Sequence, residues 1–219
     1  MDGKAILSQK VFNQLFKNPS MSSREDILKA IKANKPDLQA LPELPQFPQP
    51  VEDLGEAFRA AAEGVGAQVI EINEWEELAK AVRERYPEAK KIAHQIEGLA
   101  LSPLDWTQLT DAHDLSDVDV AIIRGEFGVG ENAAIWIPET ILPERVLPFI
   151  TQHLVIVLSK EALVWNMHQA YARIGSELPG FGVFISGPSK TADIEQSLVL
   201  GAHGARTLMI ALVPASQNA

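Results

Sequence analysis

Short apolar runs of strand length recur along the chain, separated by stretches with helical periodicity. The runs occupy residues 67–72, 91–94, 119–123, 133–137, 153–158, 182–186 and 207–213. Strands that are apolar along their whole length are typical of parallel sheets, because crossover helices bury both faces of such a sheet. The 219 residues therefore predict an α/β fold with a mostly parallel central sheet and helices on both faces.

Helical segments are expected between these runs. They are Glu52 to Gly64, Asn73 to Tyr86, a segment near Lys160 to Ile174, and Ala192 to Leu200. Asn73 is the expected N-cap of the second helix, and Pro87 stops it. Ser189 or Thr191 is the expected cap of the last helix, whose positive dipole end suits Asp193. The chain thus predicts alternating strands and helices.

The N-terminal part of the chain differs from the rest. Residues 24–32 have apolar positions on one helical face and acids in the first turn, which predicts a short amphipathic helix. Prolines at every second or third position of residues 41–50 forbid a helix and favour an extended linker. We therefore expect a helical arm and linker over 1–50, either a solvated tail or a docking element, and a domain over 51–219.

Composition excludes several classes of protein. The formal net charge of −10 argues against a general nucleic-acid binder, which needs clustered Lys and Arg. The chain has no cysteine, which excludes disulfides, thiolate catalysis and cysteine-ligated iron–sulfur clusters. No apolar run reaches membrane-spanning length and no signal-peptide pattern is present, so we expect a cytoplasmic protein that does not act at a membrane.

A glycine-rich loop over residues 128–133 has the letters of the dinucleotide fingerprint G-x-G-x-x-A. A strand-like segment follows it instead of a helix, so no helix N-terminus is available for a pyrophosphate. Two alternatives stay open. The loop is either a turn between adjacent strands or a polar site in which Glu131 and Asn132 act as an acid/base and orienting pair.

A polar corner follows the strand-like run that ends near Ser186. Lys190-Thr191 matches the end of a P-loop, but Phe184 stands where that motif needs a glycine, so a triphosphate cradle is rejected. The corner either binds a smaller anion through Ser186, Ser189, Lys190 and backbone N–H groups, or is only a capped helix start.

Histidine and arginine residues give weaker signals. His203 lies between Gly201 and Gly204, where its imidazole either faces a cleft or binds the last helical carbonyls. The other histidines lack metal-ligand spacing, so no metal site is predicted. Arg124 and Arg145 are more typical of structural ion pairs than of substrate binding.

The same corner carries a resemblance to a known family. Residues 185–195 (ISGPSKTADIE), followed by 198–204 (LVLGAHG), resemble the signature of the lactate utilization domain (LUD) family in its single-domain lactate utilization protein C branch. The similarity covers the last half of the chain well and the rest loosely. It implies a fold similar to the sugar-isomerase and CoA-transferase-like α/β superfamily, with a polar cleft at strand ends. One departure is the loop 130–134 (GENAA), where many members have Ala-Glu-Thr-Gly-Thr.

The resemblance also implies a function and partners. Such proteins take part in oxidation of lactate to pyruvate beside an iron–sulfur LUD protein and a cysteine-rich redox subunit. We therefore expect no cofactor on this chain, with iron–sulfur clusters only in the partners, and a homo-oligomer is possible. The alternatives are a non-catalytic scaffold subunit and a stand-alone isomerase or CoA-transferase-like enzyme.

These observations predict a cleft between the glycine-rich loop and the corner. We expect it to hold a small carboxylate or a phosphorylated metabolite, with Glu131 or His203 moving a proton. The predicted ligand-binding residues are Asn132, Ser186, Gly187, Ser189, Lys190, Thr191, Asp193 and Gly204.

Overall fold

The computed structural model of the chain describes residues 23–43, 45, 47–176, 180–194 and 197–217, apart from the side chains of 192–194, 197 and 198. The chain divides into two compact units, Met1–Phe47 and Pro48–Ala219, which we call the arm and the body. The division lies inside the proline-rich segment 41–50.

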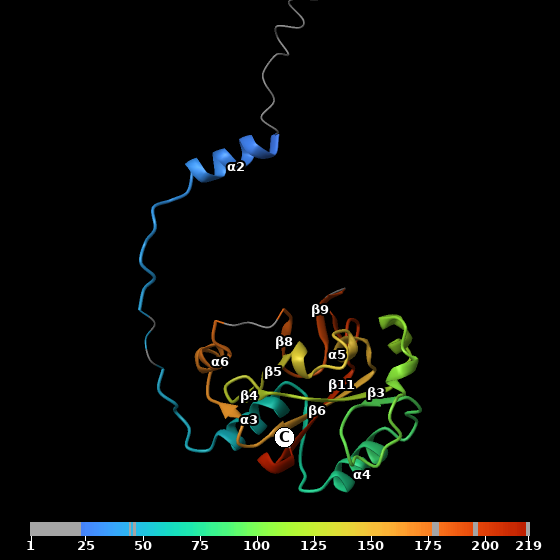
Figure 1. Cartoon of the computed structure of the whole chain (residues 1–219). Coiled ribbons are helices and arrows are strands. Elements are labelled where there is room, and N and C mark those ends of the chain that lie inside the picture. The colour runs from blue at the N-terminus through green and yellow to red at the C-terminus, as the bar shows by residue number, and fades with distance from the viewer. Residues whose placement is uncertain (1–22, 44, 46, 177–179, 195–196, 218–219) are drawn as a thin grey trace, which may run out of the picture. The chain divides into compact units, whose positions relative to one another are not determined.

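The described part of the arm contains one helix, α2 (Ser23–Ala33), labelled in Figure 1. Glu25 and Asp26 in its first turn favour the positive end of the helix dipole, as the sequence predicts. All its residues are exposed, including the apolar side chains of Ile27, Leu28 and Ile31 at 59%, 41% and 54%. The helix therefore carries an apolar face that the described residues of the arm do not cover.

The body is built on a five-stranded sheet in which every pairing is parallel. In spatial order the strands are β1 (Gln68–Glu71), β11 (Thr207–Val213), β6 (His153–Ser159), β3 (Val120–Arg124) and β2 (Ile92–His94). All five coincide with predicted apolar runs, so the predicted parallel central sheet is confirmed.

Helices cover both faces of this sheet, as predicted (Figure 1). Alternate residues of β6 enter opposite cores, because successive side chains of a strand point to opposite faces. Val155 packs in the core beneath α4 (Trp75–Arg85). Ile156 packs in the core beneath α3 (Leu54–Gly64) and α5 (Leu147–Ile150).

A second, mixed sheet was not predicted. Its order is β7 (Leu163–Val164), β4 (Phe127–Val129), β5 (Ile135–Pro138) and β8 (Gly182–Ile185). Residues Ile135 and Ile137 of β5 join the core of α3, whereas Trp136 joins a third core with α6 (Met167–Ile174). Each side of β5 is thus buried against a different layer.

Four 3₁₀ turns complete the described body. They are η1 (Trp106–Gln108), η2 (Ala112–Leu115), η3 (Glu139–Ile141) and η4 (Ala215–Gln217). No helix in the described ranges combines the length and the apolar character needed to cross a bilayer.

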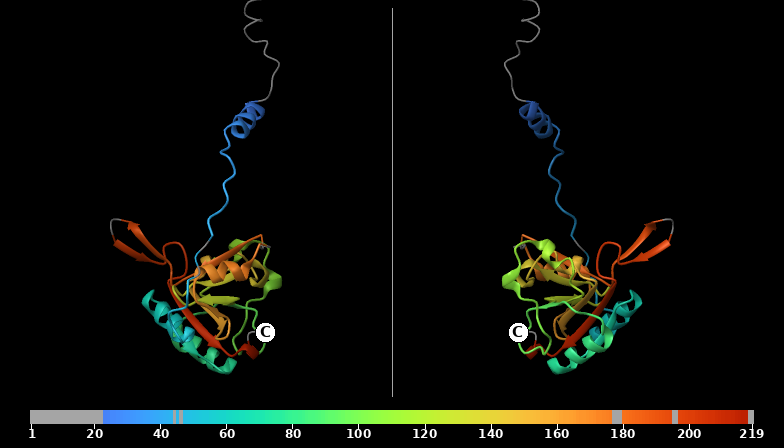
Figure 2. Two further views of the ribbon diagram at one scale, coloured as in Figure 1. Left: turned by 90° about the vertical axis from the view of Figure 1, so that its left-hand side faces the viewer. Right: turned by 90° about the vertical axis from the view of Figure 1, so that its right-hand side faces the viewer.

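The predicted helix over 192–200 is wrong. The segment is instead the hairpin of β9 (Lys190–Ile194) and β10 (Ser197–Leu200), which stands away from the rest of the body in Figure 2. Thr191 pairs with Val199, and Gly201 N–H donates to the Ser189 carbonyl at 2.9 Å, which extends the ladder. A segment this short is compatible with both the helical and the strand periodicity, and here the antiparallel ladder supplies the backbone hydrogen bonds.

Two local predictions are also corrected, and one open alternative is decided. Glu74, not Asn73, is the N-cap of α4. The helix expected near 160–174 begins only at Met167, because Leu163 and Val164 pair with β4. The glycine-rich loop over 128–133 links the antiparallel strands β4 and β5, which corresponds to the turn alternative.

Phe58 on α3 tests this packing. Its ring is fully buried, so Phe58→Ala leaves a cavity and should lower the free energy of unfolding by about 3–5 kcal/mol. Urea unfolding measures the loss. The control Phe149→Ala removes the same atoms from a ring that is 42% exposed and should cost only about 1–2 kcal/mol. Equal losses would contradict the placement of α3.

Candidate functional site

The turn after β8 brings the predicted corner against the end of α3. Gly187 has a φ of +76°, and a Cβ built there would lie 2.9 Å from the Val65 carbonyl oxygen. Only glycine adopts this conformation and this approach without strain. Val65 is the C-cap of α3, so the turn is fixed against a helix that lies more than 100 residues earlier in the chain.

A pocket of about 300 Å³, which we call the Ser189 pocket, lies under this turn. It gathers six of the predicted site residues: Ser186, Gly187, Ser189, Lys190, His203 and Gly204. Three of them lie in the turn after β8, Lys190 begins β9, and His203 and Gly204 lie in the loop between β10 and β11. The structure therefore brings most of the predicted corner to one place.

Two polar side chains of this pocket are available to a ligand. No hydrogen bond to the Ser189 hydroxyl or the His203 imidazole occurs within the described part of the chain. Ser189 is held by its backbone, whose N–H donates to the Ala205 carbonyl at 2.8 Å. Its side chain packs on Gly204, where an added Cβ would lie 3.1 Å from the Ser189 Cβ.

The rest of the pocket is largely apolar. Leu154 from β6, Leu208 from β11 and Val183 from β8 line it, together with Phe149 from α5. A surface with one hydroxyl, one imidazole and an apolar floor suits a small organic molecule that has a polar and an apolar end. Sequence reasoning missed these apolar residues, because nothing in their own segments distinguishes them from ordinary core positions.

Lys190 lines the pocket but directs its charge elsewhere. Its ammonium donates to the Val65 carbonyl at the C-terminal end of α3, where a positive charge also suits the helix dipole. Thr191 lies on β9 and does not line the pocket. The predicted role of Asp193 depends on a side chain outside the described residues.

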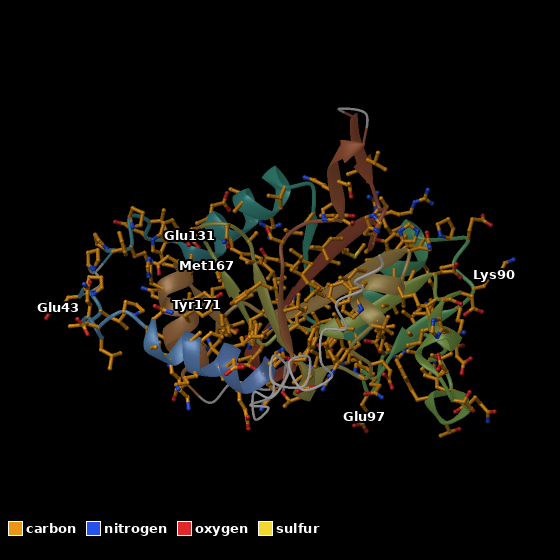
Figure 3. The ribbon with its side chains drawn as sticks, turned by 90° about the horizontal axis from the view of Figure 1, so that it is seen from above. Glu43, Lys90, Glu97, Glu131, Met167 and Tyr171 are labelled. Carbon is orange, nitrogen blue, oxygen red and sulfur yellow. The ribbon has the colours of Figure 1, made fainter. Side chains whose placement is uncertain are left out.

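Glu131 is not in this pocket. Its Oε1 accepts the Met167 N–H at 2.8 Å at the start of α6, and the two residues lie together in Figure 3. Asn132 Oδ1 accepts the Ala134 N–H at 3.0 Å, within the turn between β4 and β5. The Asn132 carbonyl accepts the Ser186 hydroxyl at 2.6 Å. The glycine-rich loop thus adjoins the corner through its backbone, while the carboxylate predicted to face the cleft caps a helix.

Other residues that the sequence singles out have structural contacts. Arg124 donates to the Gln217 carbonyl at 2.9 Å, and burial lowers the pKa of its guanidinium. Arg145 forms an ion pair with Glu139, as expected for a structural arginine. Across the described residues, no three His, Asp or Glu side chains gather as a ligand set for a metal ion.

The Ser189 pocket lies at the amino end of the central strands. Leu154 and Leu208 are the second residues of β6 and β11. In open parallel sheets, ligands commonly bind at the carboxyl ends of the strands. The pocket instead depends on β8 of the second sheet, whose carboxyl end leads into the turn.

The LUD domain family model matches residues 106–213. A lactate utilization protein C from an Exiguobacterium species is 27% identical over 171 residues, which cover 70% of this chain and 74% of that protein. A lactate utilization protein C from Shouchella clausii is 33% identical over 91 residues, covering 39% of this chain and 40% of that protein. The uncharacterized protein YkgG of Escherichia coli is 28% identical over 109 residues, covering 45% and 47%.

A solved structure is also similar. A DUF162 family protein from Deinococcus radiodurans superposes with a TM-score of 0.49 at 16% identity, covering 73% of this chain and 96% of that one.

Gly187 tests how the turn is built. Gly187→Ala places a Cβ against the Val65 carbonyl in a left-handed conformation and should destabilise the body by about 1–3 kcal/mol. Chemical denaturation measures this change. The control is Gly64→Ala, because a Cβ at the end of α3 meets nothing within 4 Å and should leave stability unchanged or raise it by about 0.5–1 kcal/mol. If Gly187→Ala lost no more stability than Gly64→Ala, the close packing of the turn against the Val65 carbonyl would be refuted.

Proposed function

Because residues 106–213 match the LUD domain family model, we propose that this chain takes part in lactate utilization by holding a small carboxylate in the Ser189 pocket. The names of its relatives support the role, and the pocket supports the class of ligand. One observation carries the binding site: the Ser189 hydroxyl and the His203 imidazole, which make no hydrogen bond within the described residues, line the same pocket as Leu154 and Leu208.

The size and chemistry of the pocket favour a ligand such as lactate. A volume of about 300 Å³ is at the lower end of ligand sites, as suits a molecule of a few heavy atoms. The Ser189 hydroxyl would donate to the carboxylate, while the methyl group would lie on Leu154 and Leu208. His203 would accept or return the proton of the substrate hydroxyl, because neutral imidazole has one donor and one acceptor nitrogen.

The oxidation itself would need partners. Conversion of L-lactate to pyruvate removes two electrons and two protons, and the chain has no cysteine to ligate an iron–sulfur cluster. The electrons would pass to an iron–sulfur LUD protein and a cysteine-rich redox subunit, as the family resemblance implies. The chain would then be the subunit that binds substrate and carries no redox centre of its own.

A second candidate function, a scaffold subunit, is favoured by the exposed helix of the arm. Ile27, Leu28 and Ile31 present an apolar face with acids and lysines around it, and no described residue of the arm covers them. A helix of this kind is suited to lie in a hydrophobic groove of another protein. In this alternative the arm recruits the redox partners and the Ser189 pocket has no ligand.

Ser189 and His203 test the ligand site. Ser189→Ala and His203→Ala should each weaken lactate binding to the purified assembly about tenfold or more, because each removes one hydrogen bond to the substrate. Calorimetric titration measures the affinity. The matched controls, Ser102→Ala and His113→Ala, change exposed residues outside the pocket and should leave it unaltered. Unchanged affinity in both pocket variants would refute the site.

Removal of residues 1–50 separates the two functions. The truncated chain should keep the affinity for lactate, because all lining residues of the Ser189 pocket belong to the body. Co-purification with the iron–sulfur partners reports on docking. Loss of the partners with binding intact supports a docking arm. Loss of lactate binding would contradict the assignment of the site to the body.

A further inference from the structure

A second hollow of about 430 Å³, which we call the Arg206 hollow, opens at the amino ends of the central strands. Arg85 and Tyr86 at the end of α4 line one side. His153 and Thr207, the first residues of β6 and β11, lie in register with each other and form the floor, with Arg206 beside them. It shares no lining residue with the Ser189 pocket.

The two arginines differ from the other arginines of the body. Arg59 and Arg145 pair with carboxylates, Arg83 and Arg124 donate to backbone carbonyls, and Arg173 lies over the Phe127 ring. Within the described residues, the guanidinium groups of Arg85 and Arg206 have no ion pair, hydrogen bond or ring contact. Two such groups in one hollow stand out in a chain whose formal charge is −10.

The position of Arg206 is built into the backbone. Its N–H donates to the Gln152 carbonyl at 2.8 Å, immediately before β6. Its side-chain stem crosses Gly201, where a Cβ would lie 2.4 Å from the Arg206 Cγ. Gly201 has a φ of +74°, so glycine both permits the turn and leaves room for the arginine. The first side-chain carbons of Arg206 thus pack over Gly201, and the exposed residue lines the hollow.

The floor supplies hydrogen-bonding groups. The Thr207 hydroxyl lies 3.0 Å from the Tyr86 hydroxyl and 2.9 Å from His153 Nδ1. The Tyr86 ring stacks on the imidazole, with centroids 4.4 Å apart. This network fixes the His153 ring by one nitrogen. In the described residues nothing bonds the other nitrogen, Nε2.

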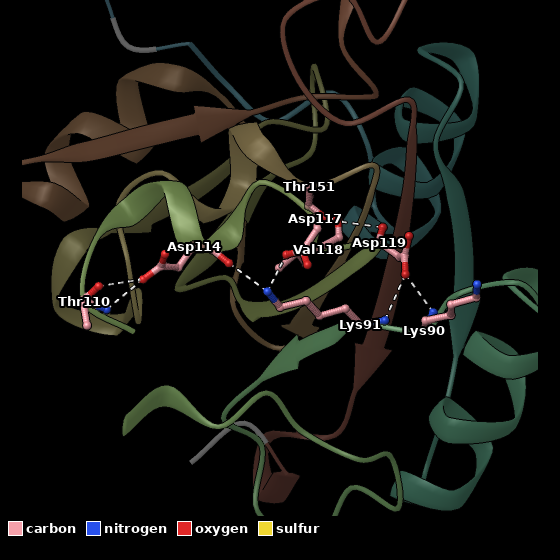
Figure 4. Close-up of polar contacts among 8 residues, drawn as sticks. All are labelled: Lys90, Lys91, Thr110, Asp114, Asp117, Val118, Asp119 and Thr151. Carbon is pink, nitrogen blue, oxygen red and sulfur yellow. Dashed lines mark hydrogen bonds and ion pairs between the residues drawn. The ribbon is translucent and has the colours of Figure 1, made fainter. Parts of the chain in front are cut away.

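Two carboxylates also line the hollow. Asp119 Oδ2 accepts the N–H groups of Lys90 and Lys91 at 2.7 and 2.9 Å, as Figure 4 shows. Those hydrogen bonds, the Lys91 one foremost, hold the pKa of the Asp119 carboxyl below its ordinary value. The negative charge of Asp119 is thus stabilised by backbone N–H groups. Glu88 is an exposed residue after the end of α4 and is not ion-paired to either arginine.

We propose that the Arg206 hollow binds the phosphate group of a small phosphorylated metabolite between Arg85 and Arg206. Guanidinium groups match the oxygen spacing of a phosphate and form two parallel hydrogen bonds to it. His153 Nε2 is available for a third oxygen. A neighbouring depression of about 520 Å³ shares Arg85, Arg206 and Thr207 with the hollow and gives room for the rest of the metabolite.

Binding should be linked to a proton on His153. Burial first, and then the charge of Arg206, lowers the pKa of the imidazole, with a further decrease from Arg85 and an opposing increase from Asp119. Glu88 and Tyr86 are the remaining titratable groups around the hollow. An anion between the arginines offsets their charge and raises the pKa of His153, so the protein takes up a proton as it binds. Affinity for the anion should rise as the pH falls through the pKa of the bound state.

Inorganic sulfate is the probe, because its charge does not change between pH 6 and 8 while that of phosphate does. Sulfate is titrated into the full chain at constant ionic strength, and the imidazole NMR signals are followed, with His153 identified by its loss in His153→Asn. The His153 signal should shift with saturation. Arg85→Gln and Arg206→Gln should each weaken the affinity at least tenfold. Arg83→Gln is the matched control on the same helix and should change it less than twofold.

The pH series completes the test. In the unaltered chain the affinity for sulfate should be higher at pH 6 than at pH 8, and His153→Asn should remove this difference. A His153 signal that does not saturate, or equal effects of the three arginine variants, would overturn the proposal. Ser189→Ala and His203→Ala should leave sulfate binding unchanged, so this result is independent of the lactate titration.

Discussion

The parallel register of β3, β6 and β11 is the constraint on which the rest of the body depends. His153 lies opposite both Val120 and Thr207, so the three strands begin at the same level. Their side chains alternate between two buried cores, and the main chain of β6 is bonded on both sides. A shift of one residue would turn every apolar side chain to the other core, so burial on both faces fixes the register strongly.

The same register creates both candidate sites. It aligns the polar residues that precede or begin the strands, Asp119, His153 and Thr207, along one edge of the sheet. It places Leu154 and Leu208 one step further in, where they form the floor of the Ser189 pocket. One edge thus supports a largely apolar pocket beside β8 and a charged hollow beside α4. The pocket is apolar and the hollow is charged because β8 covers one part of this edge and the end of α4 covers the other.

Sequence patterns located the central strands because each is a continuous apolar run bounded by polar residues. They also located the polar corner, from which Ser186, Gly187, Ser189 and Lys190 line the Ser189 pocket. They failed at the hairpin after the corner, where Thr191 and Val199 pair across a turn that short-range periodicity does not reveal. Glu131 was misjudged for a related reason. A carboxylate in a glycine-rich loop suggests chemistry, whereas the start of α6, about 36 residues later, supplies the N–H group that it accepts.

The sequence by itself determined the fold class, the amphipathic helix near the N-terminus and the location of the corner, since these depend on local composition and on strand-length apolar runs. Only the tertiary structure decided that Arg85 and Arg206 line one hollow and that Ser189 lies beside the apolar residues of its pocket. Ser189 is 19 residues from Leu208 and 35 from Leu154, Arg85 is 121 residues from Arg206, and a close approach such as that of Gly187 to Val65 leaves no periodic pattern in the chain. Contacts of this range depend on how the layers pack, which local propensities do not encode.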